Sequence, residues 1–193
     1  MLYFIVYFIT FLIFITIVTC ILNCFEYIFC VHIKKQAPFV PTCYRERKLL
    51  LKYIRENYPN AKTFCDVGSG WGGVARYIAS KTNISVIGLE NMPFSVMVSK
   101  ILNIFCFGKI KTIKCDAFEY LKKTKNKFDI LYTYLSPDKV SHLLKYKNKF
   151  KVLITADFEI PNIKPDKIIP LNHGYTLFNN KKYPHTLYIY VSK

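Results

Sequence analysis

Four glycines in the stretch FCDVGSGWGG constrain the fold of this chain more than any other feature. The chain has seven glycines, and Gly68, Gly70, Gly72 and Gly73 all lie here. The stretch follows an apolar run and opens a helical one, so the backbone must turn sharply between a strand and a helix. Such a turn brings backbone and the free N–H groups of a helix N-terminus close to a ligand. The spacing of Gly68, Gly70 and Gly73 also fits the pattern G-x-G-x-x-G, which is unspecific by itself.

Strand-like and helical segments alternate along the chain after residue 42. The expected helices span 43–58, 72–81, 93–105, 117–123 and 137–146, and the expected strands span 63–67, 84–89, 110–114, 128–135, 150–155, 167–178 and 183–191. This alternation predicts βαβ units around a mainly parallel sheet. The short segment 179–182 leaves no room for a crossover helix, so the last two strands should be antiparallel.

The first residues of the chain are strongly apolar. Residues 2–22 carry no charge, and about 20 apolar residues suffice to span a bilayer as a helix. A signal peptide would show a basic start and a small-residue cleavage site, and neither is visible. We therefore expect a transmembrane helix within 1–31, a linker at 32–42 and a soluble domain at 43–193. By the positive-inside rule, the basic residues that follow place the domain on the cytoplasmic side or its organellar equivalent; they are His32, Lys34, Lys35, Arg45, Arg47 and Lys48.

The chain is basic, with a formal net charge of +16 from 28 Lys and Arg against 12 Asp and Glu. A basic domain could meet anionic lipid or nucleic acid. Its basic residues are nearly all lysines, whereas sites that read phosphates favour arginine, so the composition argues against specific nucleic-acid binding. The seven cysteines form no C-x-x-C pair. The sequence therefore indicates neither a disulfide framework nor a metal site, and a reducing compartment is the simplest inference.

Acidic residues end three successive strand-like runs. Asp66 lies two residues before Gly68, Glu90 ends VIGLE and Asp116 ends KTIKCD. Ligands of open α/β sheets bind at the carboxyl ends of the strands, so these side chains should share one site. The charge of Asp66 opposes a pyrophosphate and favours a cationic ligand. Glu90 suits ribose hydroxyls. Asp116 or the amide of Ala117 suits an adenine edge, although the Asp116 side chain fits a helix N-cap equally well.

The sequence DVGSGWG, followed by GLE, CDA and a terminal strand pair, resembles the class I S-adenosylmethionine-dependent methyltransferases. The resemblance covers residues 43–193. It implies an α/β, Rossmann-like, seven-stranded sheet with an antiparallel last strand, preceded here by one transmembrane helix. It implies S-adenosylmethionine as cofactor, with its methionyl part at the glycine turn, its ribose at Glu90 and its adenine at Asp116. The residues expected to bind it are Asp66, Gly68, Ser69, Gly70, Glu90, Asn91, Asp116 and Ala117.

A narrower resemblance concerns the segments PFVPT and GLENMPFSVMVSK. Together with an N-terminal membrane segment, they are similar to the ATP synthase c-subunit lysine methyltransferase family and its bacterial relatives. In that family an acidic residue and then Asn-Pro follow the second strand; here Glu90 and Asn91 match, and Met92 separates Asn91 from Pro93. Trp71 stands where the family usually has an acidic residue. The resemblance implies lysine in a membrane protein as the methyl acceptor.

The acceptor site is expected after the strand at 128–135. Enzymes that methylate exocyclic amines of DNA bases resemble one another in an Asn/Asp-Pro-Pro-Tyr/Phe run there, and this chain has LSPD, which argues against base methylation. Methyl transfer depends mainly on holding the nucleophile in line with the sulfonium, so no catalytic residue is assigned. Tyr44 and Tyr134 are candidates to line the pocket, and Asp138 is a candidate to orient an amine. No spacing typical of a metal site or a catalytic triad is formed by His142, His173 and His185.

These features favour a membrane-anchored methyltransferase that modifies a protein side chain, with lysine preferred. Two alternatives stay open. An NAD-dependent oxidoreductase would share the strand–turn–helix, although Asp66 and the terminal strand pair disfavour it. A membrane-anchored binding module with a decayed cofactor site is the other alternative, and the intact glycines and acidic residues of the turn disfavour it.

Overall fold

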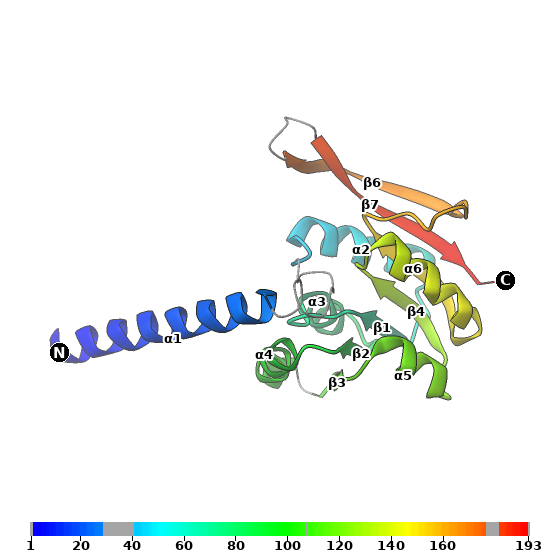
Figure 1. The fold of residues 1–193 in the computed structure, drawn as a ribbon. Coiled ribbons are helices and arrows are strands. Elements are labelled where there is room, and N and C mark those ends of the chain that lie inside the picture. Colours follow the sequence, from blue (N-terminus) through cyan, green and yellow to red (C-terminus); the bar gives the residue numbers. More distant parts are fainter. Residues whose placement is uncertain (1, 29–40, 107, 177–181, 193) are drawn as a thin grey trace. The chain divides into compact units, whose positions relative to one another are not determined.

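The computed structural model describes residues 2–28, 41–106, 108–176 and 182–192 (Figure 1). The chain divides into two units, Met1–Val40 and Pro41–Lys193. The expected linker at 32–42 lies outside the described residues except for Pro41 and Thr42, and so does the expected turn at 179–182 except for Lys182. The boundaries assigned to membrane helix, linker and domain therefore remain predictions.

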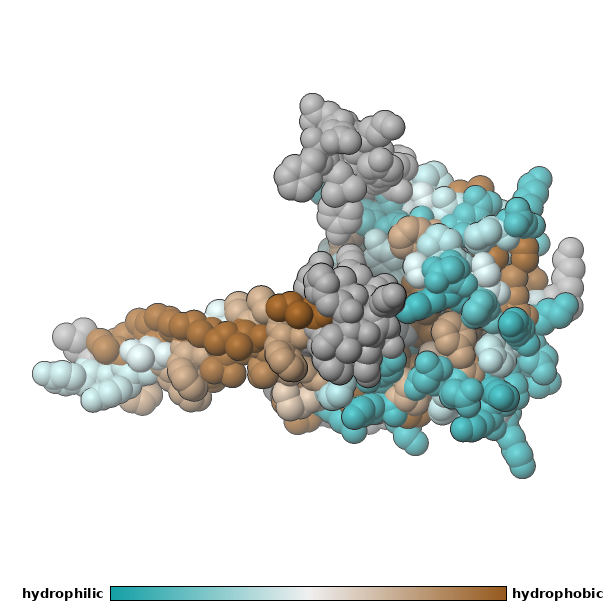
Figure 2. Space-filling view, viewed as in Figure 1, coloured by the Kyte–Doolittle hydropathy of each residue, from teal (hydrophilic) through white to brown (hydrophobic). Residues whose placement is uncertain are grey.

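The first unit contains one long helix, α1 (Leu2–Ile28). Its segment Tyr3–Leu22 has a mean hydropathy of 2.8 and is long and apolar enough to cross a bilayer, properties that a signal sequence or a core helix shares. The hydroxyl groups of Thr10, Thr16 and Thr19 donate to the carbonyl oxygens four residues earlier, at 2.9, 2.8 and 2.7 Å. Such internal bonding satisfies polar groups where no water is present. Figure 2 shows the apolar residues along α1.

The second unit is built on a seven-stranded sheet in the order β3-β2-β1-β4-β5-β7-β6. Strands β1 to β5 are parallel, β7 is antiparallel to β5, and β6 is antiparallel to β7. The expected fold class and the antiparallel end of the sheet are confirmed. The strand order reverses between β1 and β4, which is where open α/β sheets bind ligands. The strands are β1 (Thr63–Val67), β2 (Ser85–Glu90), β3 (Ile110–Lys114), β4 (Phe128–Thr133), β5 (Phe150–Ala156), β6 (Lys167–Thr176) and β7 (Lys182–Val191).

Helices cover both faces of this sheet (Figure 1). Successive residues of a strand point to opposite faces. Phe64 of β1 accordingly packs with α2 and α3, and the next residue, Cys65, packs with α5 and α6. Because both faces are covered, the central strands are largely apolar, as is usual for parallel sheets. The helices are α2 (Tyr44–Asn57), α3 (Gly73–Lys81), α4 (Pro93–Asn103), α5 (Ala117–Lys123) and α6 (Pro137–Leu143).

Among the element ends that the structure describes, those of β4, α4 and α6 lie two or more residues before the positions that the sequence indicated. Strand β4 stops at Thr133 instead of residue 135, at the same position where its neighbour β1 ends, since Thr133 pairs with Val67. Helix α4 passes into the short 3₁₀ helix Ile104–Cys106, and the chain then turns at Gly108, where φ is +77°. Helix α6 passes into the 3₁₀ helix Leu144–Lys149. Each difference lies at an element end, where the periodic pattern carries least information.

Candidate cofactor site

The glycine-rich turn joins β1 to α3 and is fixed by its own backbone hydrogen bonds. The N–H groups of Gly68 and Ser69 donate to the carbonyl oxygen of Leu89, at 2.9 and 3.0 Å, and that of Gly72 donates to the Ser69 oxygen at 2.8 Å. Gly68, Gly70 and Gly72 have φ values of +75°, +53° and +75°. Residues that carry a side chain rarely adopt this left-handed backbone conformation, so the turn requires glycine at these three positions.

Glu90, at the end of β2, organises this turn with its carboxylate. Oε2 accepts the N–H of Gly70 at 2.7 Å, while Oε1 accepts the N–H groups of Asn91 and Met92 at 2.8 and 2.9 Å. Hydrogen bonds to an ionised acceptor are roughly twice as strong as neutral ones. One carboxylate therefore joins the turn after β1 to the segment that leads into α4.

Asp66 lies in β1 just before the turn, and only 2 % of it is exposed. Burial, followed by the nearby charge of Glu90, raises the pKa of Asp66 from 3.8 to about 7, while the Ala75 backbone N–H and the charge of Arg47 act in the opposite direction. A buried carboxyl of this kind is ionised more readily when a cation lies beside it. The geometry therefore favours a positively charged ligand at this point.

Three polar atoms at this edge of the sheet are buried without a hydrogen-bond partner among the described residues. They are Asp66 Oδ2, Ser69 Oγ and Asn91 Oδ1. An unpaired buried polar atom costs about 1–3 kcal/mol, and native proteins contain few of them. Two of these atoms only accept hydrogen bonds, so together they suit a ligand that brings N–H donors or positive charge. All three residues belong to the cofactor set predicted from the sequence.

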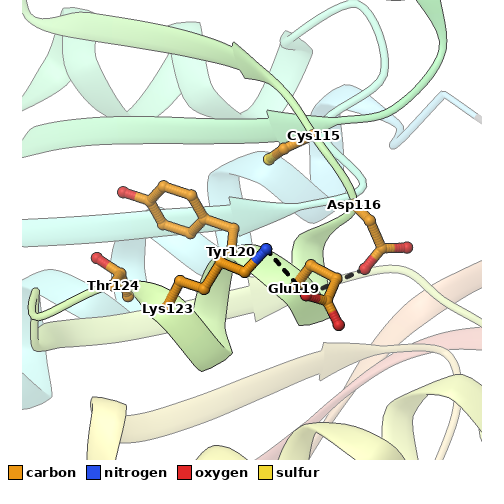
Figure 3. A pocket seen from close by; sticks show the side chains of 6 residues that line it. All are labelled: Cys115, Asp116, Glu119, Tyr120, Lys123 and Thr124. Atoms are coloured by element: carbon orange, nitrogen blue, oxygen red, sulfur yellow. Dashed lines mark hydrogen bonds and ion pairs between the residues drawn. The ribbon is translucent and has the colours of Figure 1, made fainter.

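Asp116 follows β3 and caps α5. Its Oδ1 accepts the N–H groups of Phe118 and Glu119 at 2.9 and 3.0 Å, so the N-cap role weighed from the sequence is present. Asp116 also borders an open cavity of about 340 Å³ beside α5. Figure 3 shows the residues that line it, which are Cys115, Asp116, Glu119, Tyr120, Lys123 and Thr124. The predicted contacts of Asp116 and Ala117 with adenine remain predictions.

Arg47 of α2 approaches the turn, although the sequence placed it only among the basic residues that follow the apolar segment and not in the site. A Cβ atom placed on Gly73 would lie 2.9 Å from its Nη2 atom, so the guanidinium rests against the start of α3. Its Nε and Nη2 atoms donate to the carbonyl oxygen of Thr42 at 2.9 and 2.6 Å. Nothing in the residues around Arg47 distinguishes it from the other basic residues near the linker, because its role depends on the packing of α2 against α3.

The candidates for the acceptor pocket occupy different surroundings. The hydroxyl group of Tyr134 donates to Asp157 Oδ2 at 2.7 Å. Tyr44 is exposed and meets the ring of Tyr77 edge-on at 5.7 Å. Asp138 is exposed in the first turn of α6, where hydrogen bonds, first of all from Ser136, lower its pKa. The structure thus brings Tyr134 into contact with the half-buried carboxylate of Asp157, while Asp138 stays exposed.

The structure also shows a contact of His185 that its spacing in the sequence did not indicate. Its Nδ1 atom lies 2.7 Å from Asp157 Oδ2, although the two residues are 28 positions apart in the chain. Strand pairing between β5 and β7 brings them together, with Ala156 opposite Leu187. Asp157 and His185 are therefore functional candidates that only the fold reveals.

We expect the ligand-free chain to lose stability as the pH rises from about 5 to 7. The pKa of Glu46, like that of Asp66, is about 7; burial and then the charge of Asp157 raise it from 4.5. In this range the folded chain binds more protons than the unfolded chain. The free energy of unfolding then falls by at most about 1.4 kcal/mol per pH unit for each group. This stabilisation is complete below about pH 4 and is lost as the pH passes 7.

Urea unfolding at a series of pH values, followed by the fluorescence of Trp71, measures this dependence, since the chain has one tryptophan. The double variant Asp66→Asn/Glu46→Gln should show a flatter pH profile than the wild type. Glu56→Gln is the matched control, because Glu56 lies on the exposed face of the same helix as Glu46. Wild-type stability that rises between pH 5 and 7 contradicts the expectation.

No family model matches the chain, and a search of curated proteins found no relative. Solved structures do resemble it. An RNA methyltransferase from Salinibacter ruber in complex with S-adenosyl-L-homocysteine aligns with a TM-score of 0.62 at 18% identity, over 79% of this chain and 94% of that one. A putative O-methyltransferase from Klebsiella pneumoniae gives 0.62 at 13% identity over 81% and 84%.

A third similar structure, precorrin-6y C5,15-methyltransferase from Geobacter metallireducens, gives a TM-score of 0.62 at 12% identity, over 82% of this chain and 93% of that chain. These alignments cover most of each chain. The second unit therefore has the Rossmann-like fold of class I methyltransferases. At such identities the likeness extends to the fold alone.

Proposed function

We propose that this chain is an S-adenosylmethionine-dependent methyltransferase, anchored in a membrane by α1, that methylates a protein side chain. The observation that carries the proposal is the group of buried, unpaired acceptor atoms beside the glycine turn, contributed by Asp66, Ser69 and Asn91. A ligand with an ammonium and a sulfonium would neutralise Asp66 and give these atoms partners. The fold shared with methyltransferase structures supports the same cofactor.

Different residues of the site would bind different parts of the cofactor. Asp66 and the turn at Gly68–Gly70 would hold the methionyl ammonium, and the guanidinium of Arg47 lies where it could hold the methionyl carboxylate. Glu90 would accept the ribose hydroxyls, and Asp116 with Ala117 would border the adenine. When bound, S-adenosylmethionine supplies a methyl group on a positively charged sulfur. The chain itself contributes the fixed position and the charge of the site.

An NAD-dependent oxidoreductase fits this turn less well. A pyrophosphate at such a turn is bound by backbone N–H groups. In this chain the N–H groups of Gly68, Ser69 and Gly72 already donate to backbone oxygens, and that of Gly70 donates to Glu90. Two carboxylates at the same place would repel the phosphates. The geometry therefore favours a cationic cofactor over a dinucleotide.

The acceptor we infer is an amine of a protein side chain, with lysine in a membrane protein preferred. The membrane anchor keeps the domain beside proteins of the same bilayer, and the basic residues after α1 favour a cytoplasmic or equivalent location. The resemblance of PFVPT and GLENMPFSVMVSK to the c-subunit lysine methyltransferases supports lysine. We do not propose specific binding to nucleic acid, because the basic residues are nearly all lysines, whereas sites that read phosphates favour arginine.

The full chain in lipid nanodiscs, supplied with methyl-tritiated S-adenosylmethionine and membranes from the cell that makes it, tests this function. We expect label in protein and methyllysine after acid hydrolysis, with none when the Glu90→Gln variant is used. Label in lipid or RNA would overturn the protein acceptor. A folded chain that neither binds the cofactor nor labels any acceptor would support the binding module with a decayed cofactor site instead.

A further inference from the structure

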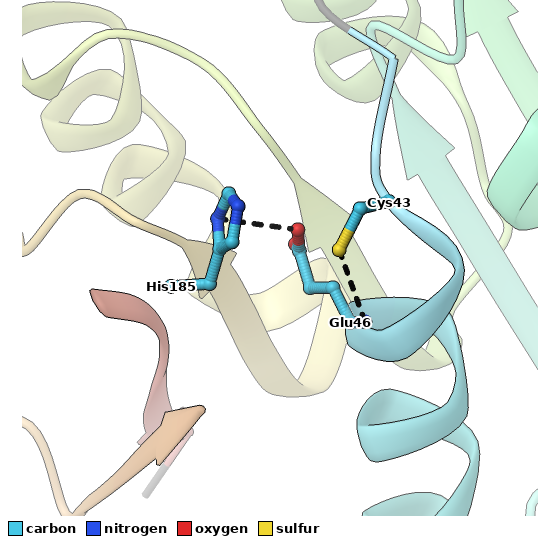
Figure 4. Close-up of side chains that lie close together, drawn as sticks. All are labelled: Cys43, Glu46 and His185. Atoms are coloured by element: carbon cyan, nitrogen blue, oxygen red, sulfur yellow. Dashed lines mark hydrogen bonds and ion pairs between the residues drawn. The ribbon is translucent and has the colours of Figure 1, made fainter. Parts of the chain in front are cut away.

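A second group of titratable side chains lies at the same edge of the sheet and takes no part in the cofactor site. Glu46, Asp157 and His185 form this acid–imidazole cluster. His185 Nδ1 lies 2.7 Å from Asp157 Oδ2 and 3.7 Å from Glu46 Oε2, and Figure 4 shows the imidazole facing Glu46. Glu46 is 1 % exposed, His185 5 % and the side chain of Asp157 17 %. Asp157 is thus the most accessible member of a buried cluster.

Local structure fixes each member of the cluster. Glu46 lies in the first turn of α2, where its N–H donates to the sulfur of Cys43 at 3.4 Å. Asp157 directly follows β5 with a left-handed φ of +60°. Its N–H donates to the Thr186 oxygen at 2.7 Å, and its Oδ1 accepts the Thr186 N–H at 2.9 Å. The two carboxylates therefore both approach the Nδ1 atom of His185, and backbone as well as side-chain contacts hold them there.

Two tyrosines of the β4 segment connect the cluster to the cofactor site. Tyr132 donates to Glu46 Oε1 at 3.1 Å, and Tyr134 donates to Asp157 Oδ2 at 2.7 Å. Tyr132 pairs with Asp66 across the β1–β4 ladder. Strand β4 lies between β1, which carries Asp66, and β5, which Asp157 follows, so the cluster and the carboxylate that we assign to the cofactor share the same carboxyl edge of the sheet.

The charges of the cluster are not balanced. His185 can neutralise one carboxylate, and Glu46 Oε2 has no hydrogen-bond partner among the described residues. The guanidinium of Arg47 faces the glycine turn and donates to Thr42, and its charge lowers the pKa of Glu46 by less than burial and the charge of Asp157 raise it. An excess negative charge in a buried site is costly unless a cation arrives to pair with it. Among the described residues, the other titratable groups around the cluster include Cys43, Tyr132, Tyr134, Tyr188 and Asp66.

We propose that the acid–imidazole cluster is the acceptor side of the active site, where Asp157 and Tyr134 receive a protonated amine and the cluster takes up its proton. This inference rests on the proposed methyltransferase function. Asp157 and Tyr134 would touch the amine, whereas Glu46 and His185 lie behind them as positioning and proton-storing groups. An amine acceptor also agrees with the negative charge of the cluster, since the cluster would repel an anionic acceptor.

The step balances without any further reactant. The ammonium transfers one proton to the cluster and becomes a neutral amine with a free electron pair. Its nitrogen forms a bond to the methyl carbon, the carbon–sulfur bond breaks, and that electron pair stays on sulfur as a neutral thioether. The product is a methylated ammonium, and the stored proton leaves to solvent through Asp157. Deprotonation is needed because a protonated amine has no electron pair to donate.

A zinc site would be a different use of the same residues. Cys43, Glu46 and His185 bring three possible ligand atoms within 4.8 Å of one another, and zinc accepts sulfur, nitrogen and oxygen ligands. The short contact of Asp157 with the imidazole and the contact of Cys43 with the Glu46 N–H engage two of these atoms already. The observations therefore favour an amine ligand over a zinc ion at these residues.

Two cofactor analogues test the inference without a known acceptor. S-adenosylhomocysteine lacks the methyl group, and sinefungin carries an amine-bearing carbon in place of the methylated sulfur. We expect the full chain in nanodiscs to bind sinefungin at least tenfold more tightly than S-adenosylhomocysteine at pH 7, with the preference shrinking at lower pH as the cluster becomes protonated. Asp157→Asn and Glu46→Gln should each reduce the preference to threefold or less. Glu56→Gln, on the exposed face of α2, should keep it.

Retained affinity for S-adenosylhomocysteine shows that a variant is folded, and Tyr134→Phe provides a second, milder change that should weaken the preference. Equal affinities of the wild type for the two analogues overturn this inference and leave the proposed function intact. Failure of the folded wild type to bind either analogue overturns both. Stoichiometric zinc in the purified chain that is lost in Cys43→Ser also overturns the inference, in favour of a metal site.

Discussion

S-adenosylmethionine is expected to bind the Asp66→Asn variant roughly 10- to 150-fold more weakly than the wild type, because a charged hydrogen bond is worth about 1.5–3 kcal/mol. Asparagine has nearly the same shape, so the buried site keeps its packing while it loses the negative charge opposite the ammonium. Titration calorimetry, or the fluorescence of Trp71 within the turn, measures the affinity. Glu56→Gln is the control.

The pH dependence of this affinity provides a second check on Asp66. The raised pKa of about 7 means that ligand-free Asp66 is largely protonated below neutrality, whereas a cationic ligand binds the ionised form. Wild-type affinity should therefore fall as the pH drops from 7 to 5, by up to about tenfold per pH unit. The Asp66→Asn variant should lack this slope. Equal affinities of variant and wild type at pH 8 would contradict the assignment of Asp66 to the cofactor.

The Glu90→Gln variant is expected to bind S-adenosylmethionine roughly 100-fold more weakly or worse, and its free energy of unfolding should fall by about 1–3 kcal/mol. In the wild type, the Glu90 carboxylate accepts three backbone N–H groups, from Gly70, Asn91 and Met92. A glutamine presents one oxygen and one NH₂ group, so at least one of these N–H groups would face another donor. Urea unfolding and calorimetry on the same sample separate the two effects. A variant with unchanged stability and unchanged affinity would show that Glu90 organises neither the turn nor the ligand.

The parts of the fold that the sequence predicted best are those fixed by short-range patterns. The bounds of β1, β3 and α5 agree with the expected ranges, because each is bordered by turn residues or a capping Asp116. The ends of α4 and β4 depend on where neighbouring elements stop, which a single segment does not encode. The antiparallel pair β6–β7 followed from the absence of room for a crossover helix.

The residues of the site likewise fall into those that a local motif predicts and those that meet only through packing. Asp66, Ser69, Glu90 and Asn91 lie within or next to strand-end motifs, and the structure brings them together around the glycine turn. The acid–imidazole cluster was missed because Glu46, Asp157 and His185 come from three separate elements that meet only through packing. The oxygen of Asp157 reaches His185 because β7 returns antiparallel to β5. Asp138, an acceptor candidate from the sequence, instead lies exposed on α6.

Calorimetric titration of the full chain in nanodiscs with S-adenosylmethionine, and separately with NAD⁺ and NADH, tests the methyltransferase proposal most directly. We predict saturable binding of S-adenosylmethionine at one site per chain, and no heat above dilution for either dinucleotide. A folded wild-type chain that binds a nicotinamide dinucleotide and leaves S-adenosylmethionine unbound would contradict the proposal and assign the glycine turn to an oxidoreductase.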